Sequence, residues 1–127
     1  MKTILVDAIN GLILEDGTIF QEMYELFESY PNDKILLTGA NDEQFKKFNL
    51  DQSPYQVFTL KHNPEKTDPA YYKTLLAQFG LTADDVVYFE HNIDATASAQ
   101  SVGIPTYFYD HTKPDLTALK QFIDTNL

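Results

Sequence analysis

The amino-acid sequence predicts an α/β domain in which a five-stranded parallel sheet is covered by helices on both faces. The first observation is that short apolar runs alternate with segments of helical period along the whole chain. The second is that several of these runs contain almost no polar residue, as expected of parallel strands buried on both faces. The third is that the connections are short, so residues 1–127 are predicted to form one domain.

Five apolar runs are the predicted strands: TILV (3–6), KILLT (34–38), QVFTL (56–60), VVYF (86–89) and TYFY (106–109). Strict alternation of strands with helices predicts parallel strands joined by right-handed crossovers. In such sheets ligands bind beyond the carboxyl ends of the strands, near the point where the strand order switches. The residues that directly follow the apolar runs are therefore the first candidates for a functional site.

Five helices are predicted between and after the strands: one over 20–27, one from Asn41, one over 69–79, one between Asp94 and Gly103, and one from near Pro114. The third is the best delimited, because Asp68 can cap it, Pro69 stands in its first turn and Gly80 follows it. Its predicted core-facing residues are Tyr72, Leu75, Leu76 and Phe79.

The segment LILEDGTIF (12–20) predicts a short β-hairpin directly after the first strand. Apolar residues lie on both sides of a Glu-Asp-Gly turn, which is a hairpin signal. Asp16 is then a turn residue at the tip of this flap. It is not expected to act in a site at the strand ends.

Composition and charge exclude several classes of function. The formal net charge is −10, and all nine basic residues are Lys. An acidic chain without Arg is a poor binder of nucleic-acid backbones, so no nucleic-acid partner is expected. No apolar segment approaches the roughly 20 residues needed to span a bilayer, the N-terminal apolar run is short for a signal peptide, and Cys is absent. These features favour a cytoplasmic protein without a membrane partner.

Polar side chains follow several of the predicted strands. Asp7 ends the first strand and Thr38 the second; Glu90 ends the fourth, with Asp94 four residues later. Lys66 lies just before the third helix. Three carboxylates, a hydroxyl and a lysine are thus predicted to meet at one edge of the sheet. Crowded carboxylates stay ionised together only when cationic groups offset their repulsion.

These residues carry a family resemblance. The segments ILVDAIN, KILLTGAND and EKTDPAYYKTLLAQFGLTADDVVYFEHNIDATASAQSVGIPTYFY resemble, in order, the motifs of the haloacid dehalogenase-like (HAD) hydrolase superfamily. The resemblance implies a three-layer Rossmann-like fold with strand order 5-4-1-2-3. It also implies a capless member, because residues 7–33 hold only the hairpin and one helix.

The resemblance assigns a role to each matching residue. Asp7 would attack phosphorus and form an aspartyl-phosphate intermediate. Thr38 would hydrogen-bond a phosphoryl oxygen, and Lys66 would neutralise charge on the nucleophile and the phosphoryl group. A Mg²⁺ cofactor is implied as well, since most members are Mg²⁺-dependent phosphatases.

The implied Mg²⁺ ligands are Asp7, the backbone carbonyl of Ile9, Glu90 and Asp94. Mg²⁺ prefers hard oxygen ligands and retains several waters, so few carboxylates suffice. Asp94 is also a candidate helix N-cap, and the two roles are compatible. His91 and Asn92 could line the site.

The chain departs from the family pattern at the first motif. Phosphatases of the family carry a second Asp two residues after the nucleophile, as the acid and base of the reaction, and here that position is Ile9. Loss of such a group typically costs 10²–10⁴-fold in rate. Asn10 and Gly11 replace the usual Gly-Thr, and Glu90 replaces the usual Asp. A dehalogenase function is set aside, because those relatives use an Arg to receive the halide and this chain has none.

Two functions follow. The first is a Mg²⁺-dependent phosphatase or phosphotransferase with an aspartyl nucleophile, acting on an unidentified phosphorylated substrate. The second is a catalytically degenerate HAD-fold protein that binds a metal, a phosphate or a protein partner. A receiver-type phosphoacceptor fits less well, because its acidic pair should lie near the first strand. His62 and His111 show no partner spacing and receive no functional assignment.

Overall fold

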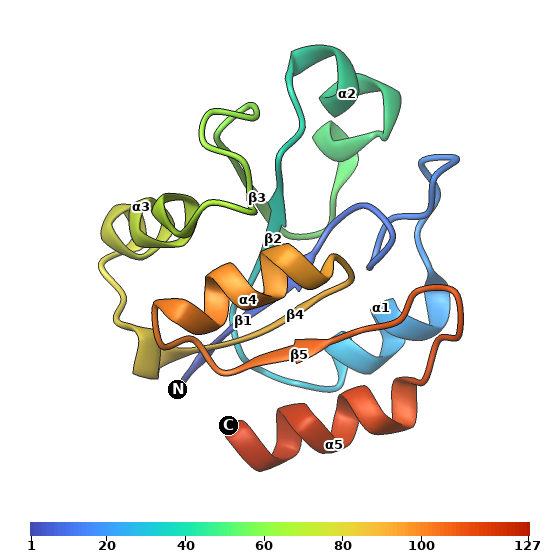
Figure 1. Ribbon diagram of the computed structural model, residues 1–127. Coiled ribbons are helices and arrows are strands. Elements are labelled where there is room, and N and C mark those ends of the chain that lie inside the picture. Colours follow the sequence, from blue (N-terminus) through green and yellow to red (C-terminus); the bar gives the residue numbers. More distant parts are fainter.

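The five apolar runs form one parallel sheet in the order β3-β2-β1-β4-β5, as the computed structural model of residues 1–127 shows (Figure 1). The strands are β1 (Thr3–Asp7), β2 (Lys34–Thr38), β3 (Gln56–Thr59), β4 (Val86–Glu90) and β5 (Thr106–Phe108). Each begins at the predicted residue and ends within one residue of the prediction. This is the predicted order 5-4-1-2-3, read from β3 instead of from β5. It places the switch in strand order between β1 and β4, where a ligand site is expected.

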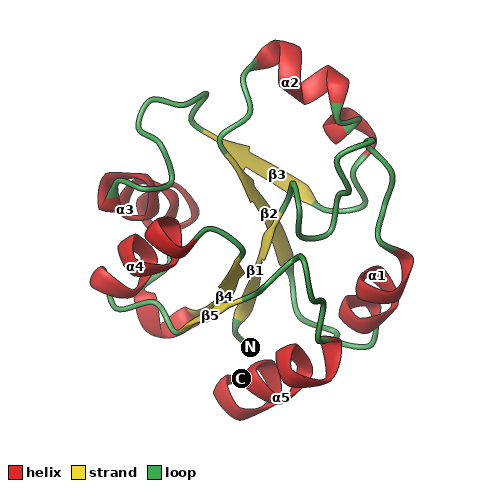
Figure 2. Ribbon diagram, turned by 45° about the vertical axis from the view of Figure 1, so that its right-hand side comes forward, coloured by secondary structure: helices red, strands yellow, loops and turns green.

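The helices lie on both faces of the sheet. They are α1 (Gln21–Glu28), α2 (Asp42–Lys47), α3 (Pro69–Phe79), α4 (Ile93–Ser101) and α5 (Leu116–Asn126). Figure 2 shows α1 and α5 on one face, α3 and α4 on the other, and α2 beyond the strand ends. The fourth helix begins two residues earlier than predicted, because Asn92 rather than Asp94 is its N-cap. The Asn92 side chain accepts hydrogen bonds from the backbone N–H groups of Asp94 and Ala95.

The sheet divides the core into two apolar clusters. Successive residues of β1 point to opposite sides, so Ile4 and Val6 pack under α1 and α5 while Leu5 packs under α3 and α4. This arrangement explains why the strands contain almost no polar residue before their last positions. Burying a large apolar side chain stabilises the fold by about 1.5–3 kcal/mol.

Helix α3 closes one face as predicted and adds one contact that its spacing did not indicate. Asp68 accepts the Ala70 N–H at the N-terminus, and Gly80 ends the helix in a left-handed conformation (φ 64°). Tyr71 is fully buried beside Tyr72, although the predicted apolar stripe omitted it. Its hydroxyl can donate to the carbonyl of Thr38 at 2.8 Å, so α3 holds the end of β2 in place.

The segment after β1 turns back tightly, as predicted, but forms no continuous strands. A single antiparallel bridge joins Ile13 and Ile19. Asp16 at the tip is exposed, and its carboxylate accepts hydrogen bonds from the N–H and hydroxyl of Thr18. At the base, a Cβ on Gly11 would lie 2.2 Å from the carbonyl oxygen of Asp7, so only glycine fits this return of the chain.

No cap domain is inserted between the strands, and the ends of the chain lie together (Figure 1). The Lys2 ammonium donates to the Asn126 carbonyl at 2.7 Å. This contact lies at the amino-terminal ends of the strands, opposite to their carboxyl ends. None of the helices combines the length and apolar character that crossing a membrane would require.

Candidate active site

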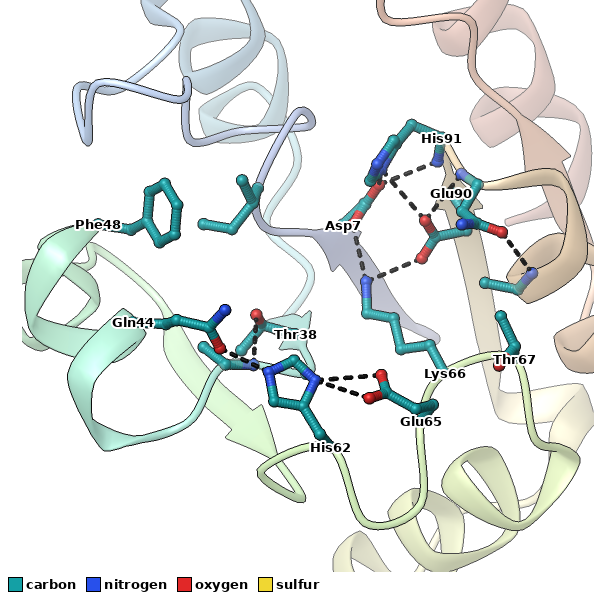
Figure 3. Close-up of a pocket in the computed structure, with 15 residues that line it drawn as sticks. Asp7, Thr38, Gln44, Phe48, His62, Glu65, Lys66, Thr67, Glu90 and His91 are labelled. Atoms are coloured by element: carbon teal, nitrogen blue, oxygen red, sulfur yellow. Dashed lines mark hydrogen bonds and ion pairs between the residues drawn. The ribbon is translucent and has the colours of Figure 1, made fainter.

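Asp7 and Glu90 end the neighbouring strands β1 and β4, and their carboxylates face the same pocket (Figure 3). Both side chains are fully buried. Lys66, from the loop before α3, places its Nζ 2.8 Å from Asp7 Oδ1 and 2.8 Å from Glu90 Oε1. One ammonium therefore bridges two carboxylates that come from distant parts of the sequence.

His91 bridges the same two carboxylates through their other oxygens. Its Nδ1 contacts Asp7 Oδ2 and lies 3.2 Å from Glu90 Oε2, and its backbone N–H donates to Asp7 Oδ2 at 2.9 Å. His111, from the loop after β5, packs edge-on against the His91 ring with 5.1 Å between ring centroids. The pair Asp7–Glu90 thus has a cationic side chain on each side.

Two further groups complete the surroundings of Glu90. The Asn92 backbone N–H donates to Oε2 at 3.0 Å, and the buried Tyr88 hydroxyl donates to Oε1. Because hydrogen bonds to the ionised form favour it, these donors support a charged Glu90 in a buried position. A carboxylate at the end of an apolar strand would otherwise be costly to bury.

The ionisation of the site reflects burial and mutual charge. Burial raises the pKa of Asp7, and the charge of Glu90 raises it further. Burial acts in the same direction on Glu90, but the charge of Lys66 and the hydrogen bonds from Lys66, His91 and Tyr88 together hold the Glu90 pKa below its usual range. Burial disfavours the ammonium of Lys66, yet Asp7 and Glu90 hold its pKa well above the usual value. The two carboxyls share the same cations and therefore titrate as a coupled pair.

His91 is held in its charged form. Burial opposes protonation, but the hydrogen bonds with Asp7 and Glu90 and the charges of these two carboxylates together raise the pKa of His91 to about 10. Near neutral pH the site therefore contains two cations, Lys66 and His91, against the two carboxyl groups.

Thr38 and Ile9 line the same pocket, which has a volume of about 320 Å³. The Thr38 hydroxyl oxygen accepts the Ala40 N–H at 3.1 Å, which leaves its own proton available to a ligand. No backbone N–H of the chain bonds to the Ile9 carbonyl, so this oxygen is available as well. A pocket of this size is at the lower end of the range for small-molecule sites.

Asp94 does not join this group. Its side chain is exposed at the first turn of α4, and it is not among the residues that line the pocket. The structure therefore brings together Asp7, Lys66 and Glu90, with Thr38 and Ile9 in the same pocket, and leaves Asp94 outside it.

The residues present fit a divalent cation. Asp7, Glu90 and His91 each offer a ligand atom, and these atoms lie within 4.8 Å of one another. The carboxylates and the Ile9 carbonyl are the hard oxygen donors that Mg²⁺ prefers, whereas an imidazole nitrogen suits transition metals better. An ion bound to the carboxylates would compete with His91 for their oxygens.

Comparison with known proteins places the fold. No family model matches the chain, and no curated protein matches its sequence. Solved structures do match it. A HAD family enzyme from Bacteroides thetaiotaomicron, studied as an aspartate-to-alanine mutant with magnesium and inorganic phosphate, gives a TM-score of 0.70 at 13% identity, over 94% of this chain and 98% of that chain.

Two further solved structures match the same fold. A HAD-superfamily hydrolase of subfamily IA from Geobacter sulfurreducens gives a TM-score of 0.59 at 13% identity, over 90% of this chain and 89% of that chain. A conserved haloacid dehalogenase-like protein of unknown function from Agrobacterium tumefaciens gives a TM-score of 0.63 at 17% identity. The match covers 84% of this chain but only 52% of the Agrobacterium chain. The chain has the HAD-like hydrolase fold, as its motifs predicted.

Proposed function

We propose that the chain is a Mg²⁺-dependent phosphohydrolase or phosphotransferase that uses Asp7 as its nucleophile. The observation that carries this proposal is the buried Asp7 carboxylate at the end of β1, 2.8 Å from the ammonium of Lys66 in an open pocket. A buried carboxyl in a cleft, with a pKa perturbed by burial and by a specific charge partner, is typical of a residue in a functional site.

Each pocket residue has a defined task in this reaction. An Asp7 oxygen attacks phosphorus while the bond to the leaving oxygen breaks, which gives an aspartyl-phosphate. Lys66 offsets the negative charge of the phosphoryl oxygens as they approach the carboxylate. The free hydroxyl proton of Thr38 donates to one of these oxygens. Gly39 and Ala40, which follow Thr38, line the same pocket.

Asp7, Glu90 and the Ile9 carbonyl would hold the Mg²⁺ ion. When bound, the ion would supply a positive charge that stabilises the transferring phosphoryl group. The Bacteroides structure, a HAD family enzyme in complex with magnesium and inorganic phosphate, supports Mg²⁺ as an ion that this fold binds. Because the Arg-free chain offers no guanidinium clamp, the phosphoryl group must be balanced by Lys66 and the other cationic groups of the pocket.

The test is turnover of p-nitrophenyl phosphate and acetyl phosphate with and without Mg²⁺. Wild-type protein should turn over substrate only with Mg²⁺, and Asp7→Asn should abolish turnover. Asp16→Asn is the matched control, because Asp16 is exposed and bonds only within its own turn. If wild type and Asp7→Asn are equally inert across a broad phosphate panel, the chain is not a phosphohydrolase.

One observation favours a second function, a catalytically degenerate module that binds phosphate or a metal. Position 9 carries Ile9, which has no group for proton transfer. In that case wild-type protein would bind Mg²⁺ or inorganic phosphate in calorimetry without turnover, and Lys66→Met would abolish phosphate binding.

A further inference from the structure

His62 lies in the loop between β3 and α3 and lines the same pocket as Asp7. Lys61 and His62 are consecutive non-glycine residues with positive φ, 54° and 64°. L-residues rarely adopt this conformation, and it persists only where the surrounding structure enforces it. The loop geometry therefore has the specific effect of presenting His62 to the pocket.

Both nitrogens of the His62 ring are held by groups from other parts of the chain. Nδ1 lies 2.9 Å from Glu65 Oε1, and Nε2 contacts the side-chain oxygen of Gln44 on α2. That oxygen also accepts the Asn41 N–H at 3.0 Å in the capping box of α2, which fixes it as an acceptor. Each ring nitrogen therefore faces an acceptor, and this arrangement is satisfied when both carry a proton.

The backbone beside Thr38 is shaped to receive this ring. A Cβ at Gly39 would lie 3.2 Å from Nδ1 of His62 and 3.5 Å from a Glu65 oxygen. Glycine at position 39 thus allows the ring to pack directly against the chain at the end of β2. His62 is placed by Glu65, Gln44 and Gly39 together.

Two adjacent residues, Glu65 and Lys66, contact His62 and Asp7 respectively through their side chains. Figure 3 shows His62 apart from Asp7, with Thr38 and Lys66 between them, whereas His91 lies directly against Asp7. In a phosphoryl transfer the leaving oxygen departs roughly in line with and opposite to the nucleophile. An acid for the leaving group is therefore needed across the pocket from Asp7.

We propose that His62, oriented by Glu65, is the acid and base of the reaction, the role for which position 9 has no group. This inference rests on the proposed phosphohydrolase function. A histidine whose second nitrogen is bonded to a carboxylate is a common arrangement for proton transfer, because the carboxylate fixes the ring and its tautomer. Gln44 accepts the Nε2 proton when no substrate is present.

As Asp7 attacks phosphorus and the bond to the leaving oxygen breaks, the Nε2 proton of His62 moves to that oxygen. His62 is then neutral, with its Nδ1 proton still bonded to Glu65. In the second half, water attacks phosphorus, its proton moves to Nε2, and the bond to Asp7 breaks to release phosphate. The carboxylate and the doubly protonated ring are both restored.

The experiment compares aryl phosphates whose leaving groups differ in their need for protonation. kcat/KM reports only the steps up to formation of the aspartyl-phosphate, so it measures the acid role of His62 separately from its role as base in the second half. His62→Gln should lower kcat/KM for phenyl phosphate by about 10²–10⁴-fold, the usual contribution of such a group. It should lower kcat/KM for 2,4-dinitrophenyl phosphate by less than about tenfold, since that leaving group departs without a proton. Glu65→Gln should give the same pattern with smaller losses. Circular dichroism verifies that each variant is folded.

Lys61→Gln is the matched control, because Lys61 shares the loop and the contact with α2 but pairs with the exposed Asp42, 3.0 Å away. It should leave both substrates unaffected. Equal losses of kcat/KM on the two substrates, or no loss with His62→Gln, would overturn the role of His62 while Asp7-dependent turnover upholds the proposed function. If wild type has no Asp7-dependent turnover, both proposals fail.

Discussion

The ammonium of Lys66 lies 2.8 Å from the carboxylate of Asp7, although 59 positions separate the two residues in the sequence. The contact is mostly buried, with 14% and 1% of the two side chains exposed. It joins the loop before α3 to the end of β1 at the switch point of the sheet. It therefore contributes both to the fold and to the chemistry proposed for the pocket.

Replacing this lysine should be costly. Lys66→Met leaves Asp7 and Glu90 buried with one cation fewer, and breaking a buried pair in this way destabilises proteins by about 3–5 kcal/mol. Urea unfolding should show this loss, together with loss of Asp7-dependent turnover. Lys120→Met is the control, because Lys120 pairs with Asp124 on the exposed surface of α5 and should cost less than about 0.5 kcal/mol. Equal stability of the two variants would contradict the structure.

Two adjacent tyrosines of α3 should respond in opposite ways to loss of their hydroxyl groups. The Tyr71 hydroxyl can donate to the Thr38 carbonyl at 2.8 Å, whereas the buried Tyr72 hydroxyl has no hydrogen-bond partner. Tyr71→Phe should destabilise the protein by about 1–2 kcal/mol, because a buried acceptor loses its donor. Tyr72→Phe should be neutral or stabilising. Thermal unfolding of the two variants tests this prediction. A larger loss of stability for Tyr72→Phe than for Tyr71→Phe would show that the Tyr72 hydroxyl has a hydrogen-bond partner.

Stability should depend on pH through His91. Its pKa rises from 6.5 in the unfolded chain to about 10 in the folded protein, so the folded state holds the proton more tightly. The contribution of His91 to stability is therefore complete below about pH 6.5 and is lost as the pH rises through about 10. Urea midpoints of metal-free protein should fall over this interval.

The matched variant for this dependence is His91→Gln, which keeps a polar side chain but has no proton to lose. Its urea midpoints should change less between pH 6.5 and 10 than those of wild type. Parallel curves for the two proteins would show that His91 does not bridge Asp7 and Glu90 as a cation.

A carboxylate at position 9 separates the two candidate functions. If His62 supplies the proton, Ile9→Asp should change wild-type turnover by less than about tenfold, and it should restore much of the turnover lost in His62→Gln. A gain of about 10²–10⁴-fold in an otherwise inert wild type would instead identify a chain that has lost catalysis on an intact scaffold. Steady-state rates on phenyl phosphate measure both outcomes.

The sheet could be predicted closely because its information is local. Each strand is a short apolar run that needs burial on both faces, and α3 carries its own start and stop signals at Asp68, Pro69 and Gly80. The meeting of Asp7, Glu90 and Lys66 could be anticipated because the carboxyl ends of parallel strands share one edge. Topology alone brings such residues together.

The contacts that escaped prediction depend on loops and on side-chain direction. His91 was expected only as a residue that could line the site, since nothing in its spacing shows that its ring turns toward Asp7. His62 received no role, because its partners Gln44 and Glu65 meet it only through a loop with two left-handed residues. Asp94 was expected at the metal site, but Asn92 caps α4, and Asp94 lies exposed in its first turn.

The hydrogen bond between Lys2 and Asn126 has a practical meaning for experiments on this protein. It fixes both ends of the chain on the side of the sheet where the strands begin, remote from Asp7 and Glu90 at the carboxyl ends of the strands (Figure 1). A flexible linker at either end can therefore anchor the molecule to a sensor chip or bead with its pocket facing the solution. Phosphate esters carried on large macromolecules can then be offered to the pocket without obstruction from the support.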